Sequence, residues 1–380
     1  MKLLKLRVPS GYKMLEKGFE INFLTKTRIN KDSNNDDLIE LTEGLFYPKE
    51  TVFVGKNSSG KTTVLELVYA ALQLVSRGRI LSKYFIINDD VTIEFIAYHN
   101  HKLYKYIGTF IKPLVNEEYL IIKDESLFES EYRKNHNKDL SNVNFKRVND
   151  FVSSVDTDTS NVYRYFNRDE LNIFVSLFED MAGMFDVHID LFKNEYSLDT
   201  FMKLVHVFDD SIESIDAHYD ESGNKTSYYD FKRVNEDKVL VTSEVLSRIL
   251  SKGTVRGINL YATALLSFKT GGTIIVDELE KNFNKNLISN LILMFNDPTI
   301  NKANASIIYS THYSELLDET DRCDNINVLH RNGNTITLKN MCTDYNTRTD
   351  MLKSNQFDQN AFDNNVNYNL LAELKKELRK

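Results

Sequence analysis

Hydrophobic positions near the amino terminus alternate with polar ones, which is the pattern of half-buried β-strands. Residues 3–8 and 19–23 form two such runs, and residues 51–54 form a continuous apolar run that ends at a glycine. After Lys61 the spacing changes: apolar residues recur at i, i+3, i+4 and i+7 from Val64 onward, which predicts an amphipathic helix. A buried strand, a glycine and a helix in this order indicate an α/β core.

The same two periodicities return in the last third of the chain. Residues 273–276 and 306–310 are short apolar runs that predict buried strands. Helical spacing of apolar positions recurs within residues 258–266 and 287–295. An Asn-Gly dipeptide inside residues 327–338 favours a hairpin. Alternating strands and helices on both sides of an intervening segment predict one α/β domain that this segment splits.

The intervening segment combines alternating runs, which predict a small β-meander, with a helical stretch. Within residues 169–214 we expect a mainly helical fold with one apolar face formed by Leu171, Phe174, Val175 and Phe178. The expected divisions are an α/β domain made of residues 1–85 and 240–345, an inserted lid or sensor segment at 86–239 and a tail at 346–380. The tail ends in a short amphipathic helix whose leucines could pack on the body of the protein or on a partner, and we expect them to pack on the body.

Composition narrows the classes of function. The 380 residues are 42% hydrophobic, which is enough for a large core, and the net charge of −8 argues against a protein that coats nucleic acid through bulk charge. The net charge does not exclude a local basic patch that binds nucleic acid. Cys323 and Cys342 are too few for a disulfide framework or a four-cysteine zinc site, so we expect a reducing, cytoplasmic location. Since no run of about 18 apolar residues occurs, we expect no membrane span.

Residues 55–62, Gly-Lys-Asn-Ser-Ser-Gly-Lys-Thr, match the phosphate-loop pattern G-x-x-x-x-G-K-[ST]. Its glycines let backbone N–H groups surround phosphate oxygens, Lys61 reaches the β- and γ-phosphates, and the Thr62 hydroxyl ligates Mg²⁺. The predicted strand before it and helix after it are the context that this motif needs. We therefore expect bound ATP and Mg²⁺, with nucleotide contacts from Gly55, Lys56, Asn57, Ser58, Ser59, Gly60, Lys61, Thr62 and Thr63.

Two acids, Asp277 and Glu278, follow the apolar run 273–276 directly. This places both at the carboxyl end of a strand, where open α/β sheets bind their ligands. Asp277 can hold the magnesium shell with Thr62, and Glu278 can polarise an attacking water. Together with the phosphate loop, the pair favours ATP hydrolysis over nucleotide binding alone.

Two more motifs stand at characteristic distances from Asp277. Leu-Ser-Lys-Gly-Thr at 250–254 precedes a predicted helix, with Ser251 26 residues before Asp277, and Ser-Thr-His at 310–312 follows Asp277 by up to 35 residues. In this order the motifs resemble those of ABC-type ATPase heads, most closely the SMC and DNA-repair branch. Within that branch they resemble the compact AAA-type ATP-binding proteins of bacterial abortive-infection and other phage-defence systems. The resemblance implies a P-loop NTPase fold, a mixed sheet flanked by helices.

The resemblance also implies a homodimer or a higher assembly with ATP between subunits. Ser251 and Gly253 would contact the γ-phosphate held by the partner's phosphate loop, and His312 would sense it, completing a catalytic set with Lys61 and Glu278. One family feature is missing, because the glutamine loop has no candidate among Gln73, Gln356 and Gln359. Tyr12 could stack on adenine, although a core tyrosine is the better interpretation.

The leading hypothesis is an ATP-dependent dimeric switch that controls a partner effector, a nuclease or toxin, in anti-phage defence. The alternatives are a nuclease similar to the OLD family and a DNA-associated ATPase of the SMC or repair type. A transporter subunit is disfavoured by the missing glutamine loop and the long insertion. Only 68 residues follow His312, and a solvated tail is the better interpretation of the carboxylates a nuclease would need there, Asp344, Asp350, Asp358 and Asp363.

Overall fold

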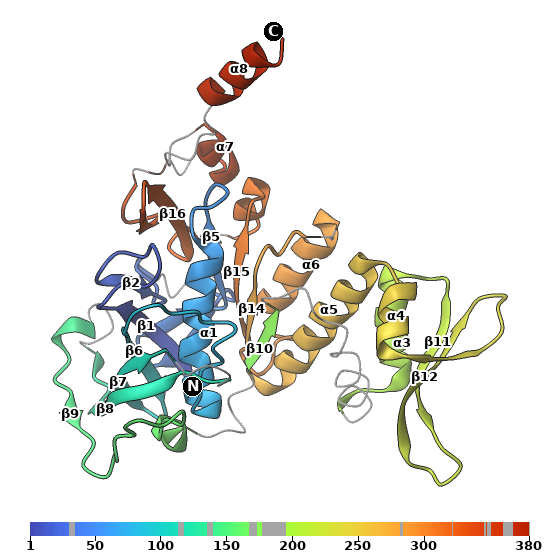
Figure 1. The fold of residues 1–380 in the computed structure, drawn as a ribbon, viewed down its shortest axis with the longest axis horizontal. Helices are drawn as coiled ribbons and strands as arrows, with labels where there is room; N and C mark the ends of the chain where they lie inside the picture. The colour runs from blue at the N-terminus through green and yellow to red at the C-terminus, as the bar shows by residue number, and fades with distance from the viewer. Residues whose placement is uncertain are drawn as a thin grey trace.

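The described part of the chain contains two six-stranded sheets, a three-stranded sheet and a two-stranded sheet (Figure 1). The computed structural model describes residues 1–29, 35–112, 118–134, 140–166, 173–176, 195–281, 284–320, 322–345, 347, 351–359 and 368–379. Within these residues, no helix combines the length and apolar character that a bilayer span requires.

The first six-stranded sheet is antiparallel and belongs to the amino-terminal part of the chain. Its strand order is β2 (Phe19–Asn22), β1 (Lys2–Val8), β6 (Val91–His99), β7 (Lys102–Ile111), β8 (Ile121–Glu131) and β9 (Lys146–Arg147). Alternation along β1 buries Leu4, Leu6 and Val8 fully, as the sequence pattern predicts. Because β1 pairs directly with β6, the sheet runs across the expected boundary at residue 86. The division into domains stays a prediction.

The second six-stranded sheet carries the two halves of the predicted α/β core. Its order is β10 (Ile173–Ser176), β14 (Thr273–Val276), β15 (Ser306–Thr311), β5 (Glu50–Val54), β16 (Ile326–Asn332) and β17 (Thr335–Asn340). The first five strands are parallel, and β17 returns antiparallel to β16. The carboxyl ends of β14, β15 and β5 therefore meet at one edge, although they are far apart in the sequence.

Helices cover both faces of this second sheet (Figure 1). α1 (Lys61–Arg77) lies on one face, and α5 (Lys252–Thr270) and α6 (Lys285–Asn296) lie on the other. Successive side chains of β5 point to opposite faces of the sheet. Phe53 packs in the core around α1, while Val52 and Val54 pack in the core around α5 and α6. This is the mixed α/β, P-loop arrangement expected from the sequence.

A smaller unit precedes α5 at the edge of the molecule (Figure 1). It contains α3 (Leu198–Phe208), α4 (Ser243–Ile249) and an antiparallel sheet of β11 (Ile212–Tyr219), β12 (Lys225–Arg233) and β13 (Val239–Thr242). Phe201 of α3 is fully buried, and Tyr229 and Phe231 of β12 are nearly so, in the same core as α5. The unit therefore packs against the helix that carries the 250–254 motif at its start.

The structure contradicts the expected helix around residue 174. Phe174 and Val175 belong to strand β10, which pairs in parallel with β14. A short apolar run has too few residues for its spacing to distinguish a strand from a helix, so the prediction failed there. The other two residues of that expected face, Leu171 and Phe178, lie outside the described residues.

The tail contains two helices, α7 (Lys353–Asp358) and α8 (Tyr368–Glu377). α8 projects away from the body (Figure 1), and Leu374 and Leu378 are 50% and 77% exposed. The expectation that these leucines pack on the body is wrong. These two leucines share one helix face, but charged residues lie on both sides of it, so the apolar stripe is narrow and its burial would gain little free energy. The remaining short elements are β3 (Leu38–Thr42), β4 (Leu45–Pro48), η2 (Leu140–Asn142), η3 (Val162–Tyr165) and η5 (Ser314–Asp318).

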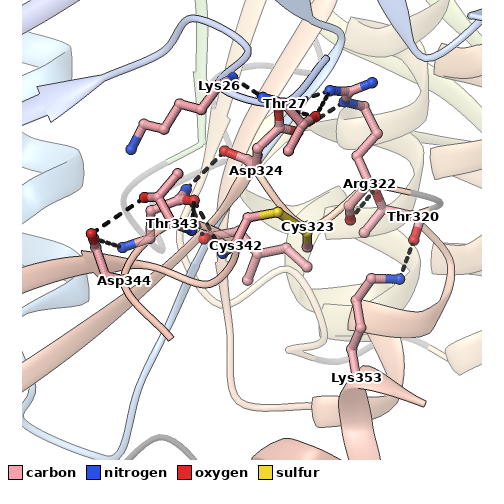
Figure 2. The surroundings of a disulfide bond; sticks show 12 residues. Lys26, Thr27, Thr320, Arg322, Cys323, Asp324, Cys342, Thr343, Asp344 and Lys353 are labelled. Carbon is pink, nitrogen blue, oxygen red and sulfur yellow. Dashed lines mark hydrogen bonds and ion pairs between the residues drawn. A yellow bond between two sulfur atoms is a disulfide. The ribbon is translucent and has the colours of Figure 1, made fainter. Parts of the chain in front are cut away.

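The two cysteines flank the β16–β17 hairpin and are joined. Cys323 and Cys342 form a disulfide with their Cα atoms 5.2 Å apart (Figure 2). Cys323 precedes β16 and Cys342 follows β17, so the bond closes the base of this hairpin. The sequence separation of the pair gave no sign of this contact. The cytoplasmic location stays a prediction.

Beside the disulfide, Asp324 ties the hairpin to an amino-terminal loop (Figure 2). Its carboxylate accepts two hydrogen bonds from Arg322, at 2.7 and 2.8 Å, and others from the backbone N–H groups of Lys26 and Thr27. Burial by itself would raise the pKa of Asp324, but the hydrogen bonds and charge of Arg322 and the Thr27 N–H bring it below the usual value. The hairpin is thereby anchored on the side away from its turn.

A buried acid in β5 predicts a pH-dependent stability. Glu50 is 2% exposed and accepts a hydrogen bond from the Tyr309 hydroxyl at 2.5 Å, and burial raises the pKa of Glu50 from 4.5 to about 7. The protonated acid stabilises the fold fully below pH 4.5, and this contribution is lost as the pH rises to about 7. Glu50→Gln keeps an acceptor but has no proton to lose. Its stability relative to the natural protein should rise across that interval by on the order of 3 kcal/mol.

Denaturant unfolding of both proteins at pH 5 and pH 8 measures this change. Glu315→Gln, at an exposed position of η5, is the matched control and should show little pH-dependent difference. An equal stability difference between Glu50→Gln and the natural protein at both pH values would contradict the assignment of Glu50 as a buried, proton-binding group.

Candidate nucleotide-binding site

The phosphate-loop motif connects the end of β5 to the start of α1. Gly60 is the N-cap of α1 with a φ of 98°, and a Cβ there would lie 2.4 Å from Ile336 Cδ1. Only glycine suits both the left-handed backbone and this close contact. No side chain caps this end of α1, so its first N–H groups face the loop and are suited to a phosphate.

The other glycine of the motif is required by close packing. A Cβ on Gly55 would lie 2.5 Å from Ser59 Oγ and 2.7 Å from the carbonyl oxygen of Leu329. The loop therefore rests on β16 on one side and on β17 at Gly60 on the other. The phosphate loop therefore packs against the β16–β17 hairpin that the disulfide closes.

Lys61 points back into the loop. Its side chain is nearly buried, and its Nζ donates to the carbonyl oxygens of Gly55 at 2.8 Å and Lys56 at 3.2 Å. Nζ also lies 3.3 Å from His312 Nδ1. Burial lowers the pKa of Lys61 to about 8, against the opposing negative charges of Asp277, Glu280 and Glu278. The ammonium is thus held beside the position at which the motif would place a β- or γ-phosphate.

Thr62 and Asp277 meet across the sheet edge. Thr62 Oγ1 donates to Asp277 Oδ2 at 2.6 Å, and Ser310 Oγ donates to Asp277 Oδ1 at 2.5 Å. A hydroxyl and a carboxylate are the hard oxygen ligands that Mg²⁺ prefers, and Mg²⁺ typically takes its remaining ligands from water and substrate phosphates. The described residues contain no group of three or more His, Cys, Asp or Glu that could hold a metal ion. A metal ion at this position would take its other ligands from water and from the nucleotide phosphates. The site therefore fits a magnesium–nucleotide complex.

Glu278 and His312 face each other at the edge of the site. His312 Nε2 is 3.6 Å from Glu278 Oε1, and both side chains are partly exposed. Glu278 has a φ of 49°, the left-handed region that a non-glycine residue rarely adopts. Its carboxylate is therefore aimed by a backbone reversal directly after β14. Such a carboxylate is placed to orient a water beside a phosphate.

These residues line one pocket of about 470 Å³. Its described lining is Met14, Asn57, Ser58, Ser59, Gly60, Lys61, Thr62, Thr63, Asp277, Glu278, His312 and Arg331. Gly55 and Lys56 contribute through the carbonyl oxygens that accept from Lys61. Sequence reasoning missed Met14 and Arg331, and only the hairpin pattern around Arg331 could have suggested that this segment lies near the phosphate loop.

The 250–254 motif stands at the start of α5 and outside this pocket. Ser251 is the N-cap of α5, accepts from the Thr254 N–H at 3.0 Å and is exposed, and neither Ser251 nor Gly253 is among the described lining residues. One turn further, Arg256 donates to the carbonyl oxygens of Asp277 and Glu278 at 2.8 and 2.9 Å. The motif is therefore connected to the two acids of the same chain, through an arginine that the sequence analysis did not single out.

Two secondary expectations can be compared with the structure. Tyr12 is 2% exposed and stacks on Phe85 with ring centroids 4.1 Å apart, which confirms the interpretation as a core tyrosine. Gln73 is buried in α1, where its side-chain oxygen accepts from the Leu81 N–H. Gln73 is therefore engaged in the core and does not line the described pocket.

Comparison with solved structures finds similar chains of low sequence identity. The SMC head domain from Thermotoga maritima is 13% identical with a TM-score of 0.40, covering 90% of this chain and 99% of that one. An SMC head bound to the C-winged helix domain of ScpA is 12% identical with a TM-score of 0.44, covering 89% and 97%. A search of curated proteins finds no match.

Comparison with protein families finds a match over residues 51–318, which is more than half of the chain. The matched span runs from the strand before the phosphate loop to beyond His312, so it includes the acids and the 250–254 motif. The resemblance to abortive-infection ATPases is thereby confirmed at the level of the family. The chain belongs to the family described as "AAA domain, putative AbiEii toxin, Type IV TA system".

Proposed function

We propose that this protein binds ATP with Mg²⁺ and hydrolyses it to ADP and phosphate. The observation that carries the proposal is the convergence on one pocket of the phosphate loop, the Thr62–Asp277 pair and the Glu278–His312 pair. Phosphoryl transfer depends mainly on positioning and charge neutralisation, and these groups supply both. The pocket volume lies in the range that nucleotide-sized ligands occupy.

Each group has a role in this proposal. Lys61 and the N–H groups at the start of α1 bind the phosphates, while Thr62 and Asp277 hold Mg²⁺, which neutralises phosphate charge when bound. Glu278 orients the attacking water, and His312, between Lys61 and Glu278, contacts the γ-phosphate. The contact of Ser310 with Asp277 keeps that carboxylate in one orientation.

We further propose a homodimer, or a higher assembly, in which Ser251 and Gly253 complete the partner's site. Two features support it: the start of α5 is exposed, and it lies outside the pocket of its own subunit. The N-terminus of a 19-residue helix is a favourable place for a phosphate because its dipole is positive there, although Ser251 already accepts from the Thr254 N–H. ATP would then join two copies of the chain.

For the biological role, we propose an ATP-dependent switch, located in the cytoplasm, that controls a partner effector in anti-phage defence. The family description, which names a toxin and a toxin–antitoxin system, supports this role. The effector would be a nuclease or toxin on another chain. Nucleic acid stays a second candidate partner.

The alternative, a nuclease within this chain, depends on the tail carboxylates. Asp344 accepts from the Asn340 N–H at 2.7 Å, and Asp358 accepts from Ser314 Oγ at 3.1 Å. Both therefore serve local structure, whereas Asp350 and Asp363 lie outside the described residues. The observed contacts favour the switch.

Replacing Lys61 tests the phosphate loop. Lys61→Ala should weaken ATP binding by roughly 100-fold, because charge-assisted hydrogen bonds to two phosphates are lost. In the natural protein the affinity should fall by up to about tenfold per pH unit above pH 8, since Lys61 must then take up a proton to bind. Fluorescence titration with a Mg²⁺–ATP analogue measures both effects. Lys285→Ala, at an exposed lysine, is the control, and unchanged affinity of Lys61→Ala would reject the assignment.

Replacing Glu278 tests hydrolysis and dimerisation together. Glu278→Gln should lower the ATPase rate by about 100-fold or more while retaining ATP, because only the group that orients the water changes. Light scattering should then show a dimer with ATP and a monomer with ADP. Adding Ser251→Arg to this variant should keep ATP binding but prevent the dimer, since the new side chain fills the start of α5. An ATP-bound Glu278→Gln protein that stays monomeric would contradict the dimer.

A cleavage assay separates the switch from the nuclease alternative. The purified chain should leave DNA and RNA intact with ATP and either Mg²⁺ or Mn²⁺. Cleavage that Asp344→Asn abolishes and Glu278→Gln preserves would instead place the effector within this chain.

A further inference from the structure

A second buried acid follows the site residues closely. Glu280 is 8% exposed, and its Oε1 accepts a hydrogen bond from the backbone N–H of His312 at 2.6 Å. Its Oε2 is buried and has no hydrogen-bond partner in the described chain. A carboxylate is costly to bury and needs a strong partner, so this placement suggests a role that an apolar residue cannot fill.

Glu280 belongs to the acidic turn, residues 277–281, which is fastened to the end of β15 at several points. The N–H of Glu278 donates to Ser310 Oγ at 2.8 Å, and the N–H of Leu279 donates to the Ser310 carbonyl oxygen at 3.0 Å. The turn closes on itself through the Lys281 N–H and the Glu278 carbonyl oxygen, 2.9 Å apart. These contacts maintain the left-handed backbone of Glu278.

The Glu280 contact differs from the others because it reaches His312 itself. The imidazole of His312 stands between Lys61 Nζ and Glu278 Oε1, at 3.3 and 3.6 Å. A histidine beyond the last residue of β15 would otherwise have its backbone free to shift. The hydrogen bond that the His312 N–H donates to the Glu280 carboxylate fixes that backbone, and so the place from which the ring reaches the pocket.

We propose that Glu280 is a positioning residue that holds His312 at the γ-phosphate end of the pocket and couples its contact there to the placement of Glu278. The inference rests on the proposed ATPase function. Since Glu280 and Glu278 belong to one hydrogen-bonded turn, a displacement of His312 is transmitted through two residues to the carboxylate that orients water. Two properties of the Glu280 side chain matter for this role: its length, here called its reach, and its ability to accept the hydrogen bond from the His312 N–H.

Three substitutions separate reach from charge. Glu280→Gln keeps the length and a carbonyl acceptor, and its kcat should stay within about fivefold of the natural protein. Glu280→Asp keeps the charge but is one methylene shorter, and Glu280→Ala removes the acceptor. Both should lower kcat by about 30- to 100-fold, as small misplacements of reacting groups do. In Glu280→Asp, which keeps a negative charge near Lys61, the KM for ATP should change by less than about threefold, because the phosphate loop is untouched.

A second readout distinguishes positioning from simple support of the fold. Glu280→Ala and Glu280→Asp should reduce the preference for an unreactive ATP analogue over ADP, since His312 would sense the γ-phosphate less well. Glu280→Gln should retain it. Rates are expressed per folded molecule, with the folded fraction measured by thermal unfolding, and Glu315→Ala is the control at an exposed acid.

The outcomes are separable. Absence of ATPase activity in the natural protein would overturn the proposed function itself. Hydrolysis by the natural protein, with an unchanged kcat in Glu280→Ala or an active Asp variant beside an inactive Gln variant, would overturn the positioning role alone. If Glu280→Ala does not fold, the comparison of the Gln and Asp variants still decides between reach and charge.

Discussion

The hydrogen bond from Thr62 to Asp277, 2.6 Å long, connects the first residues of α1 with the end of β14. It can form only because β14, β15 and β5 are parallel neighbours whose carboxyl ends share an edge. Some 215 residues separate the two side chains in the sequence, and the sheet brings them into contact. The phosphate loop, the acidic turn and His312 are all placed by this one register of three strands.

Sequence reasoning succeeded where the chemistry is local. Strand β5, the phosphate loop and α1 follow from alternation, glycine positions and helical spacing, which act within a few residues. It failed at β10, where four residues show no distinguishing period, and at α8, whose leucines are exposed. It also could not see Arg256, Glu280, Met14 or Arg331 at the site, because their contacts join elements that no local pattern connects.

Arg256 gives the fold a direct connection between two surfaces with different tasks. The start of α5, at Ser251, is exposed, whereas Asp277 and Glu278 line the nucleotide pocket of the same chain. Arg256 donates to the carbonyl oxygens of both acids from the second turn of α5. The exposed end of the helix and the acidic turn therefore cannot move independently without breaking these hydrogen bonds. Within the proposed dimer, each subunit would relate the partner's nucleotide to its own acids.

Locally unfavourable features gather around the pocket. Lys61 is nearly buried, Ser58 and Glu278 have left-handed backbones, and Glu280 is a buried acid with one unpartnered oxygen within the described chain. Each costs folding free energy. The carbonyl oxygens of the loop after β5 hold Lys61, and the segment from Ser310 to His312 at the end of β15 holds Glu278 and Glu280. Sequences selected for stability alone avoid such choices, so their concentration in one place points to function. A magnesium-bound triphosphate would use these features together, because its charge suits the buried ammonium and its oxygens suit the inward-facing N–H groups of the loop.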